Sequence, residues 1–178
     1  MFIPTEKHPA FFITLDVRLM TKIFVRDDLC QIIIDSWNYC EKHYNIKVMN
    51  YVIMPDHIHF IFYFKNENEK LIKKEKIGLR GKYNIITNGK IDDFIKNFKK
   101  FTAHEILKRL KQEESEYLSR FALKKEKKNK HYFTLWLDDK HNVIINNEEV
   151  LKKKQKYIFN NPIKKGLVNN INEYKYIK

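Results

Sequence analysis

Two histidines separated by one residue, His57 and His59, stand in a segment rich in β-branched and aromatic residues that predicts a β-strand. Side chains alternate between the two faces of a strand, so both imidazoles are expected on the same face. Two neighbouring imidazoles can bind one divalent metal ion. Taken alone, the pair is explained somewhat better by two histidines that fall on one strand by chance and bond to their neighbours.

A tyrosine and an asparagine form a second group that could do chemistry. Tyr157 and Asn161 are four residues apart in a predicted helix, and Lys153 lies one turn earlier on the same face. A phenol, an amide oxygen and an ammonium in a row could act as nucleophile, metal ligand and phosphate contact. The alternative is a tyrosine that packs on the sheet and an asparagine that caps the helix C-terminus. This pattern alone favours the alternative.

The third feature is an excess of basic residues. Lys and Arg number 35 against 22 Asp and Glu, so the formal net charge is +13 and the sequence pI is about 9.5. A domain this basic favours a polyanionic partner, nucleic acid before an anionic membrane surface. The candidate phosphate contacts are Lys96, Lys99, Lys100, Lys153 and Lys154. A solvated lysine-rich surface is the alternative, and both interpretations stay open.

Length and composition narrow the class of protein. The 178 residues are 43% hydrophobic, enough for a single folded domain over residues 1–178. The N-terminus does not have the pattern of a secretory signal, and no apolar run approaches the ~18 residues of a membrane helix. Cys30 and Cys40 form neither a disulfide framework nor a zinc-ligand pattern. We therefore expect a cytoplasmic protein with reduced thiols that does not contact a membrane.

The elements that must position these residues follow from hydrophobic periodicity and turn residues. In chain order they are a strand and turn over 11–24, a helix over 27–43, a hairpin over 47–64 that turns at 54–56, a polar loop over 66–90, a helix over 92–110, an exposed charged insertion over 111–131 whose mobility stays open, a short strand and loop within 131–145, and a helix over 148–161 ended by Pro162. This order predicts an α+β sandwich, an antiparallel sheet with helices packed on it.

Three segments resemble one known family. The stretch MNYVIMPDHIHFIFYF is similar to the signature of the IS200-like transposase superfamily, which carries histidine, hydrophobe, histidine after such a strand and turn. The stretches FIKNFKKFTAHEI and YIFNNPIKKGLV resemble two helices of the REP-associated tyrosine transposase branch, and HNVIINNEEVLKKKQKY keeps the family's spacing between a loop histidine, here His141, and the tyrosine. Together the segments cover most of residues 10–170 in the family's order, which makes the resemblance specific.

The resemblance implies a ferredoxin-like fold and a nuclease site of the HUH type with one tyrosine. By position, His57 and His59 would be metal ligands, Asn161 a third ligand, and Tyr157 the nucleophile. Asp56 stands where asparagine is common in the family. The implied cofactor is a divalent ion, Mg²⁺ or Mn²⁺, and the implied partner is single-stranded or hairpin DNA, cleaved through a 5′-phosphotyrosine.

Other functions stay open beside this transposase-like nuclease. They are a rolling-circle initiator or relaxase that uses the same three residues, a DNA-binding protein of the same fold without catalysis, and a structural domain stabilised by zinc. The intact histidines and tyrosine count against the loss of catalysis, and the lack of further ligands at suitable spacing counts against structural zinc. The sequence leaves monomer and homodimer undecided.

Overall fold

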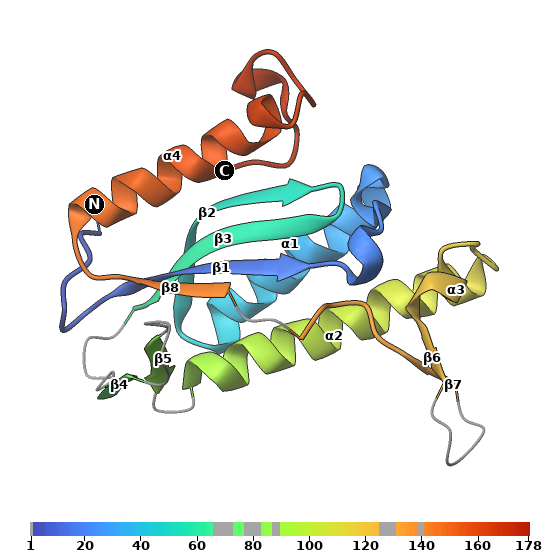
Figure 1. The fold of residues 1–178 in the computed structure, drawn as a ribbon, viewed down its shortest axis with the longest axis horizontal. Helices are drawn as coiled ribbons and strands as arrows, with labels where there is room; N and C mark the ends of the chain where they lie inside the picture. Colours follow the sequence, from blue (N-terminus) through green and yellow to red (C-terminus); the bar gives the residue numbers. More distant parts are fainter. Residues whose placement is uncertain (1, 66–72, 77–82, 87–89, 125–130, 139–140) are drawn as a thin grey trace.

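A four-stranded antiparallel sheet lies at the centre of the computed structural model, which describes residues 2–65, 73–76, 83–86, 90–124, 131–138 and 141–178 (Figure 1). Its strands are β1 (Ala10–Asp16), β2 (Ile46–Met54), β3 (His57–Phe64) and β8 (His141–Ile145), in the order β2-β3-β1-β8. Helix α1 (Asp27–His43) connects β1 to β2, and α2 (Lys90–Gln112) lies between β3 and β8 in sequence. This βαββαβ order is the ferredoxin-like arrangement, so the predicted fold class is confirmed.

The two faces of the sheet are covered by different helices. Helices α1 and α2 lie side by side on one face, and α4 (Glu148–Lys164) lies across the other (Figure 1). Successive side chains of β1 point to opposite faces of the sheet. Phe11 and Ile13 therefore pack in the core under α1 and α2, and Phe12 packs in the core under α4. The core under α1 and α2 is the larger of the two.

Helix α1 forms where the periodicity predicts it. Asp27 and Asp28 lie in its first turn, where acidic side chains favour the helix dipole. Its buried side chains recur at steps of three and four, and they include Cys30 and Cys40, which are free thiols. Burial raises the pKa of both thiols to about 12. The helix is followed by Asn45, whose φ of 53° is the left-handed conformation that asparagine tolerates.

Helix α4 begins where it was expected but does not end there. The Asn147 side chain caps its first turn, accepting a hydrogen bond from the Val150 N–H at 2.9 Å. The prediction that Pro162 ends the helix was wrong, because α4 continues through that residue to Lys164. The chain leaves the helix at Gly166, two residues beyond Lys164, where φ is 66°.

Two hydrogen bonds explain this ending. The Gly166 N–H donates to the Ile163 carbonyl and the Leu167 N–H donates to the Pro162 carbonyl, which together form a Schellman motif. Proline removes one helical N–H donor, but Pro162 is itself buried and its carbonyl is paired. The extra turn places Asn161 inside the helix instead of at its end.

Two other regions differ from the sequence prediction. Within residues 66–90, the backbones of β4 (Lys73–Lys76) and β5 (Tyr83–Ile86) pair as an antiparallel ladder, so the loop prediction was wrong for these eight positions. The rest of that segment before Lys90 lies outside the described residues. No described helix combines the length and apolarity that a membrane crossing needs.

The charged segment 111–131 is not exposed throughout. It contains α3 (Leu118–Phe121) and β6 (Ala122–Lys124), and β6 pairs with β7 (His131–Phe133). Phe121 is fully buried in the larger core, and Glu113 forms an ion pair with Arg26. Charge dominates the composition of the segment, but Tyr117, Leu118 and Phe121 pack it against the larger core. Residues 125–130 lie outside the described part of the chain.

Candidate active site

The two histidines begin β3 on the sheet face that α4 covers. His57 lies opposite Asp16 of β1 and Met54 of β2, and His59 lies opposite Thr14. The two imidazole rings are neighbours, with centroids 4.8 Å apart and planes at 69°. Both side chains are buried at the sheet end beside the β2–β3 turn.

Each imidazole is oriented by an oxygen at its Nδ1 atom. His57 Nδ1 lies 2.5 Å from Asp56 Oδ1, and His59 Nδ1 lies 2.8 Å from Thr14 Oγ1. When Nδ1 carries the proton and donates it to these oxygens, the lone pair of each ring is at Nε2. This is the outer-shell arrangement that orients metal-binding histidines.

His59 Nε2 is buried and has no hydrogen-bond partner among the described residues. Burial, helped by His57 and the positive charge of Lys154, lowers the pKa of His59 to about 3. The ring is therefore neutral near pH 7, the form that binds metal ions. An unpartnered buried polar atom costs ~1–3 kcal/mol, so packing alone does not explain its placement.

The α4 tyrosine lies against this pair. The Tyr157 ring centroid is 5.1 Å from that of His59 and 5.8 Å from that of Phe12, in edge-on geometry in both cases. Its side chain is 44% exposed, and the structure gives its hydroxyl no hydrogen bond to any described residue. A core tyrosine bonded to backbone, the alternative considered above, has a different environment.

Tyr174 shows what that alternative looks like in the same molecule. Its hydroxyl donates to the Ile53 carbonyl at 2.7 Å, and burial raises its pKa to about 12. Tyr157 has neither this anchor nor this burial. The comparison distinguishes a tyrosine that holds the fold together from one whose hydroxyl is accessible beside two imidazoles.

Asn161 lies one helical turn beyond Tyr157 and is buried, with 6% of its surface exposed. Its Nδ2 atom has no hydrogen-bond partner among the described residues. Rotating the amide by half a turn puts its oxygen in that place, an exchange that heavy-atom positions do not distinguish. Within the described part of the chain no three His, Cys, Asp or Glu side chains are grouped to hold a metal ion. A neutral amide oxygen is a donor that suits Mg²⁺ or Mn²⁺.

The structure brings Lys154, not Lys153, to the tyrosine. Lys154 Nζ lies 4.6 Å from the centroid of the Phe12 ring and 5.9 Å from that of the Tyr157 ring, and burial lowers its pKa. Lys153 is 70% exposed and its Nζ pairs with Glu149 Oε1 at 2.6 Å. The cation beside the phenol therefore comes from the position three residues before it.

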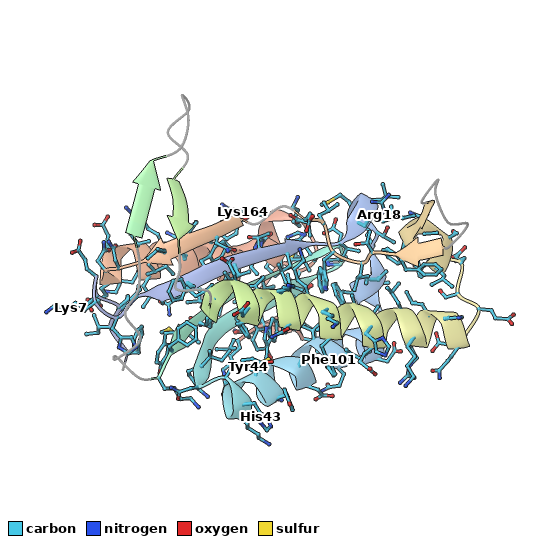
Figure 2. The ribbon with its side chains drawn as sticks, turned by 90° about the horizontal axis from the view of Figure 1, so that it is seen from below. Lys7, Arg18, His43, Tyr44, Phe101 and Lys164 are labelled. Atoms are coloured by element: carbon cyan, nitrogen blue, oxygen red, sulfur yellow. The ribbon has the colours of Figure 1, made fainter. Side chains whose placement is uncertain are left out.

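The three candidate lysines of α2 belong to the helical layer on the sheet face opposite α4. Lys96 and Lys100 are exposed on α2, and Lys99 Nζ donates to the Leu137 carbonyl at 2.7 Å. Figure 2 looks onto the layer of α1 and α2, which covers the sheet face opposite α4. Within the described residues no contact joins Lys96 or Lys100 to the imidazoles. Lys99 is linked through Leu137 to Asp16, the residue opposite His57.

Sequence reasoning missed the residues that support the pair. Asp56 was visible as the neighbour of His57, but its role at Nδ1 was not foreseen. Thr14 is 45 residues from His59 in sequence, and only the pairing of β1 with β3 brings the two together. Phe12, which stacks on His59 with ring centroids 5.4 Å apart, follows from the same pairing.

The fold and site together define a ferredoxin-like α+β domain whose C-terminal helix lays a tyrosine over a histidine pair. In particular, the chain is similar to a solved REP-associated tyrosine transposase bound to a REP hairpin, with a TM-score of 0.61 and 15% identity. That match covers 95% of this chain and 75% of the other. The fold implied by the sequence resemblance is thus confirmed.

A proposed transposase from Deinococcus radiodurans R1 also matches, with a TM-score of 0.48, 12% identity, and coverage of 86% of this chain and 90% of the other. No protein-family model and no curated protein matches the chain.

Proposed function

We propose that this protein is a metal-dependent, single-tyrosine DNA endonuclease and strand transferase of the IS200-like type, in its REP-associated branch. The observation that carries the proposal is the Tyr157 ring, exposed and 5.1 Å from the buried imidazole of His59, whose Nε2 has no partner among the described residues. Sequence motifs and fold point to the same class independently. The net charge of +13 suits a DNA partner.

The metal ligands in this proposal are Nε2 of His57, Nε2 of His59 and the amide oxygen of Asn161. All three are neutral donors, so a bound Mg²⁺ or Mn²⁺ would keep its full charge to polarise the non-bridging oxygens of the scissile phosphate. Asp56 and Thr14 hold the two imidazoles in the required tautomer.

Tyr157 is the nucleophile in this proposal. Its oxygen attacks phosphorus, the bond from phosphorus to the 3′-oxygen breaks, and the 5′-phosphate becomes attached to the tyrosine. The phenol proton leaves to water, and the departing 3′-oxygen takes a proton from water. Lys154 places a positive charge beside the ring that carries the attacking oxygen, where it can attract the DNA phosphate. Attack by a 3′-hydroxyl reverses the exchange, so strands can be rejoined without ATP.

The substrate class in this proposal is single-stranded or hairpin DNA. The similar solved transposase is bound to a REP hairpin, which supports a hairpin substrate here. An exposed phenol at the edge of α4 suits an unpaired strand that can approach it. A DNA-binding protein without catalysis would have no reason to keep His59 Nε2 buried beside that phenol without a partner among the described residues.

A covalent-adduct assay tests the proposal. End-labelled single-stranded and hairpin DNA are incubated with the protein and Mg²⁺ or Mn²⁺, then separated on a denaturing gel. The wild type should give a labelled protein–DNA adduct that disappears with EDTA. Tyr157→Phe should bind DNA and melt like the wild type but form no adduct, because the attacking oxygen is gone.

Tyr174→Phe is the matched control. It should keep the adduct and lose about 1 kcal/mol of stability with its hydrogen bond to Ile53. An adduct that survives in Tyr157→Phe would assign the chemistry to another residue. A wild type that binds DNA but never forms an adduct would favour the DNA-binding alternative.

A further inference from the structure

A cavity of about 460 Å³ lies on the same sheet face as the imidazoles, and the proposed chemistry does not use it. It is bounded by β2, by Tyr63 near the end of β3, by the first turns of α4 and by residues 2–3. Its volume is within the range of about 300–1,000 Å³ found for small-molecule sites. Its lining combines two amides and two aromatic rings with the charged residues Lys47, Glu148, Lys152 and Lys178.

A β-bulge turns one of those amides into the cavity. The register of β2 against β3 shifts between Val48 and Asn50. Val48 packs in the core under α1 and α2, and regular alternation would send Asn50 to that same face. The extra residue instead turns Asn50 toward α4, where it lines the cavity. Bulges of this kind commonly re-aim side chains beside functional sites.

Asn50 meets a second amide in the cavity wall. Gln155 Nε2 on α4 donates to Asn50 Oδ1 at 2.8 Å, and Asn50 Nδ2 donates to the Lys178 carbonyl at 3.1 Å. These bonds fix both side chains. Gln155 keeps its carbonyl oxygen and a second N–H, an acceptor beside a donor. This is the pattern with which amide side chains bind the edges of nucleobases.

A stacked ring pair forms another wall. The rings of Phe2 and Tyr63 are parallel, with centroids 3.7 Å apart and planes at 9°. Both side chains are partly exposed. Aromatic faces of this kind stack on unpaired bases.

The cavity lies within reach of the proposed site of cleavage. Tyr63 follows His59 by four residues on β3, a distance of about 13 Å at ~3.3 Å per residue. A DNA strand with a rise of ~3.4 Å would cross that distance in about four nucleotides, and a more extended strand in fewer. On α4, Gln155 is two residues before Tyr157. The same helix therefore carries the amide and the nucleophile.

We propose that this cavity, the base pocket, holds one unpaired nucleobase of the bound DNA strand and selects it by its edge. The Asn50–Gln155 pair reads the base edge, and the Phe2–Tyr63 stack supports its face. This inference rests on the proposed function for its ligand, DNA, but not on the cleavage step. Together, the two proposals mean that the protein selects its cleavage site partly through one base, which lies a few nucleotides from the scissile phosphate.

Selection from a randomised single-stranded DNA library tests the base pocket. Protein-bound DNA is recovered in EDTA, so that no strand is cleaved, and is sequenced. The wild type should enrich one base at one position, by at least about fivefold, the size of one good bidentate contact. Gln155→Leu and Phe2→Ala should each lose the preference at that position and keep the others. Gln31→Leu, which changes an exposed amide on α1, is the matched control and should keep the full pattern.

The outcomes separate the two proposals. An unchanged pattern in Gln155→Leu and Phe2→Ala, or a wild type without any base preference, overturns the base pocket. In a third outcome, the variants lose the base preference as expected but the wild type forms no adduct in the presence of metal. This outcome supports the base pocket and overturns the nuclease proposal. Phe2 is a partly exposed ring, so Phe2→Ala serves as the test if thermal melting shows that Gln155→Leu is unfolded.

Discussion

The two faces of the central sheet are built differently. The face under α1 and α2 buries aromatic and aliphatic side chains almost exclusively, with Phe60 packed among Trp37, Phe94 and Phe98. The face under α4 has a smaller core and also buries two imidazoles and the Asn161 amide. Buried polar atoms cost stability unless they are paired. His59 Nε2 and Asn161 Nδ2 are unpaired within the described residues, and in the larger core Trp37 Nε1 is unpaired as well.

This difference separates the part of the molecule that holds the fold from the part that is available for chemistry. The larger core fixes the sheet, and the fixed sheet then holds β1 and β3 in the register that brings Thr14 to His59. The smaller core attaches α4 through Leu151 and Ile158. Tyr157, the neighbour of Ile158 on α4, is thereby placed against the His59 imidazole. The unpartnered atoms on this face belong to His59 and Asn161, the side chains proposed above as metal ligands.

The largest expected effect on stability is at Phe60, and its neighbour in β3, His59, provides the comparison because its side chain is on the opposite face of the sheet. Phe60 is fully buried on the α1–α2 face, and His59 is 3% exposed on the α4 face. Phe60→Ala should lower the free energy of unfolding by about 3–5 kcal/mol, because it leaves a cavity in the larger core. His59→Ala should cost much less in EDTA, since it also removes an unpartnered buried nitrogen.

Urea unfolding followed by circular dichroism measures both variants. Equal losses in the two would make His59 a core residue like any other, and would end the distinction between the faces.

A bound metal ion should stabilise the wild type through the α4 face. Any ligand that binds only the folded state stabilises it, by about 2.7 kcal/mol at a concentration 100 times its Kd. Titration with Mn²⁺ should therefore raise the melting temperature of the wild type. The same titration should leave His57→Ala and His59→Ala unmoved, because each has lost a ligand, while a surface variant such as Gln31→Leu responds fully.

Thermal melts at several metal concentrations give this answer without any cleavage assay. A response in the double variant His57→Ala, His59→Ala equal to that of the wild type would place the metal elsewhere.

The smallest expected effect concerns the lysines. Lys154 lies beside Tyr157, whereas Lys96 and Lys100 project from α2 on the other side of the sheet. Lys154→Gln should reduce adduct formation and lower the salt dependence of DNA binding by about one ion. Lys96→Gln with Lys100→Gln should leave adduct formation unchanged.

Binding isotherms at several salt concentrations, with the adduct assay in parallel, compare the two sets. If the α2 variant loses the adduct and Lys154→Gln keeps it, DNA reaches the site across the helical layer.

Much of the fold was predictable because its signals are local. Helix α1 occupies the predicted residues 27–43, and the hairpin turns where Pro55 and Asp56 predict it. The pairing of β4 with β5 escaped prediction because β4, Lys73–Lys76, consists only of charged residues. Pro162 misled the prediction because its helix is ended by Gly166, and the Schellman bonds there outweigh one missing donor.

The sequence by itself determined which reactive side chains this protein has and how they are spaced. The spacing of His57 and His59 places them on one strand face, and the four-residue step from Tyr157 to Asn161 places them on one helix face, because both periodicities are properties of the backbone. Only the tertiary structure decided which groups meet. Thr14, Lys154 and Phe12 reach the site through strand pairing and the packing of α4, which join residues far apart in the chain. Such contacts depend on register and helix rotation, and no local pattern encodes them.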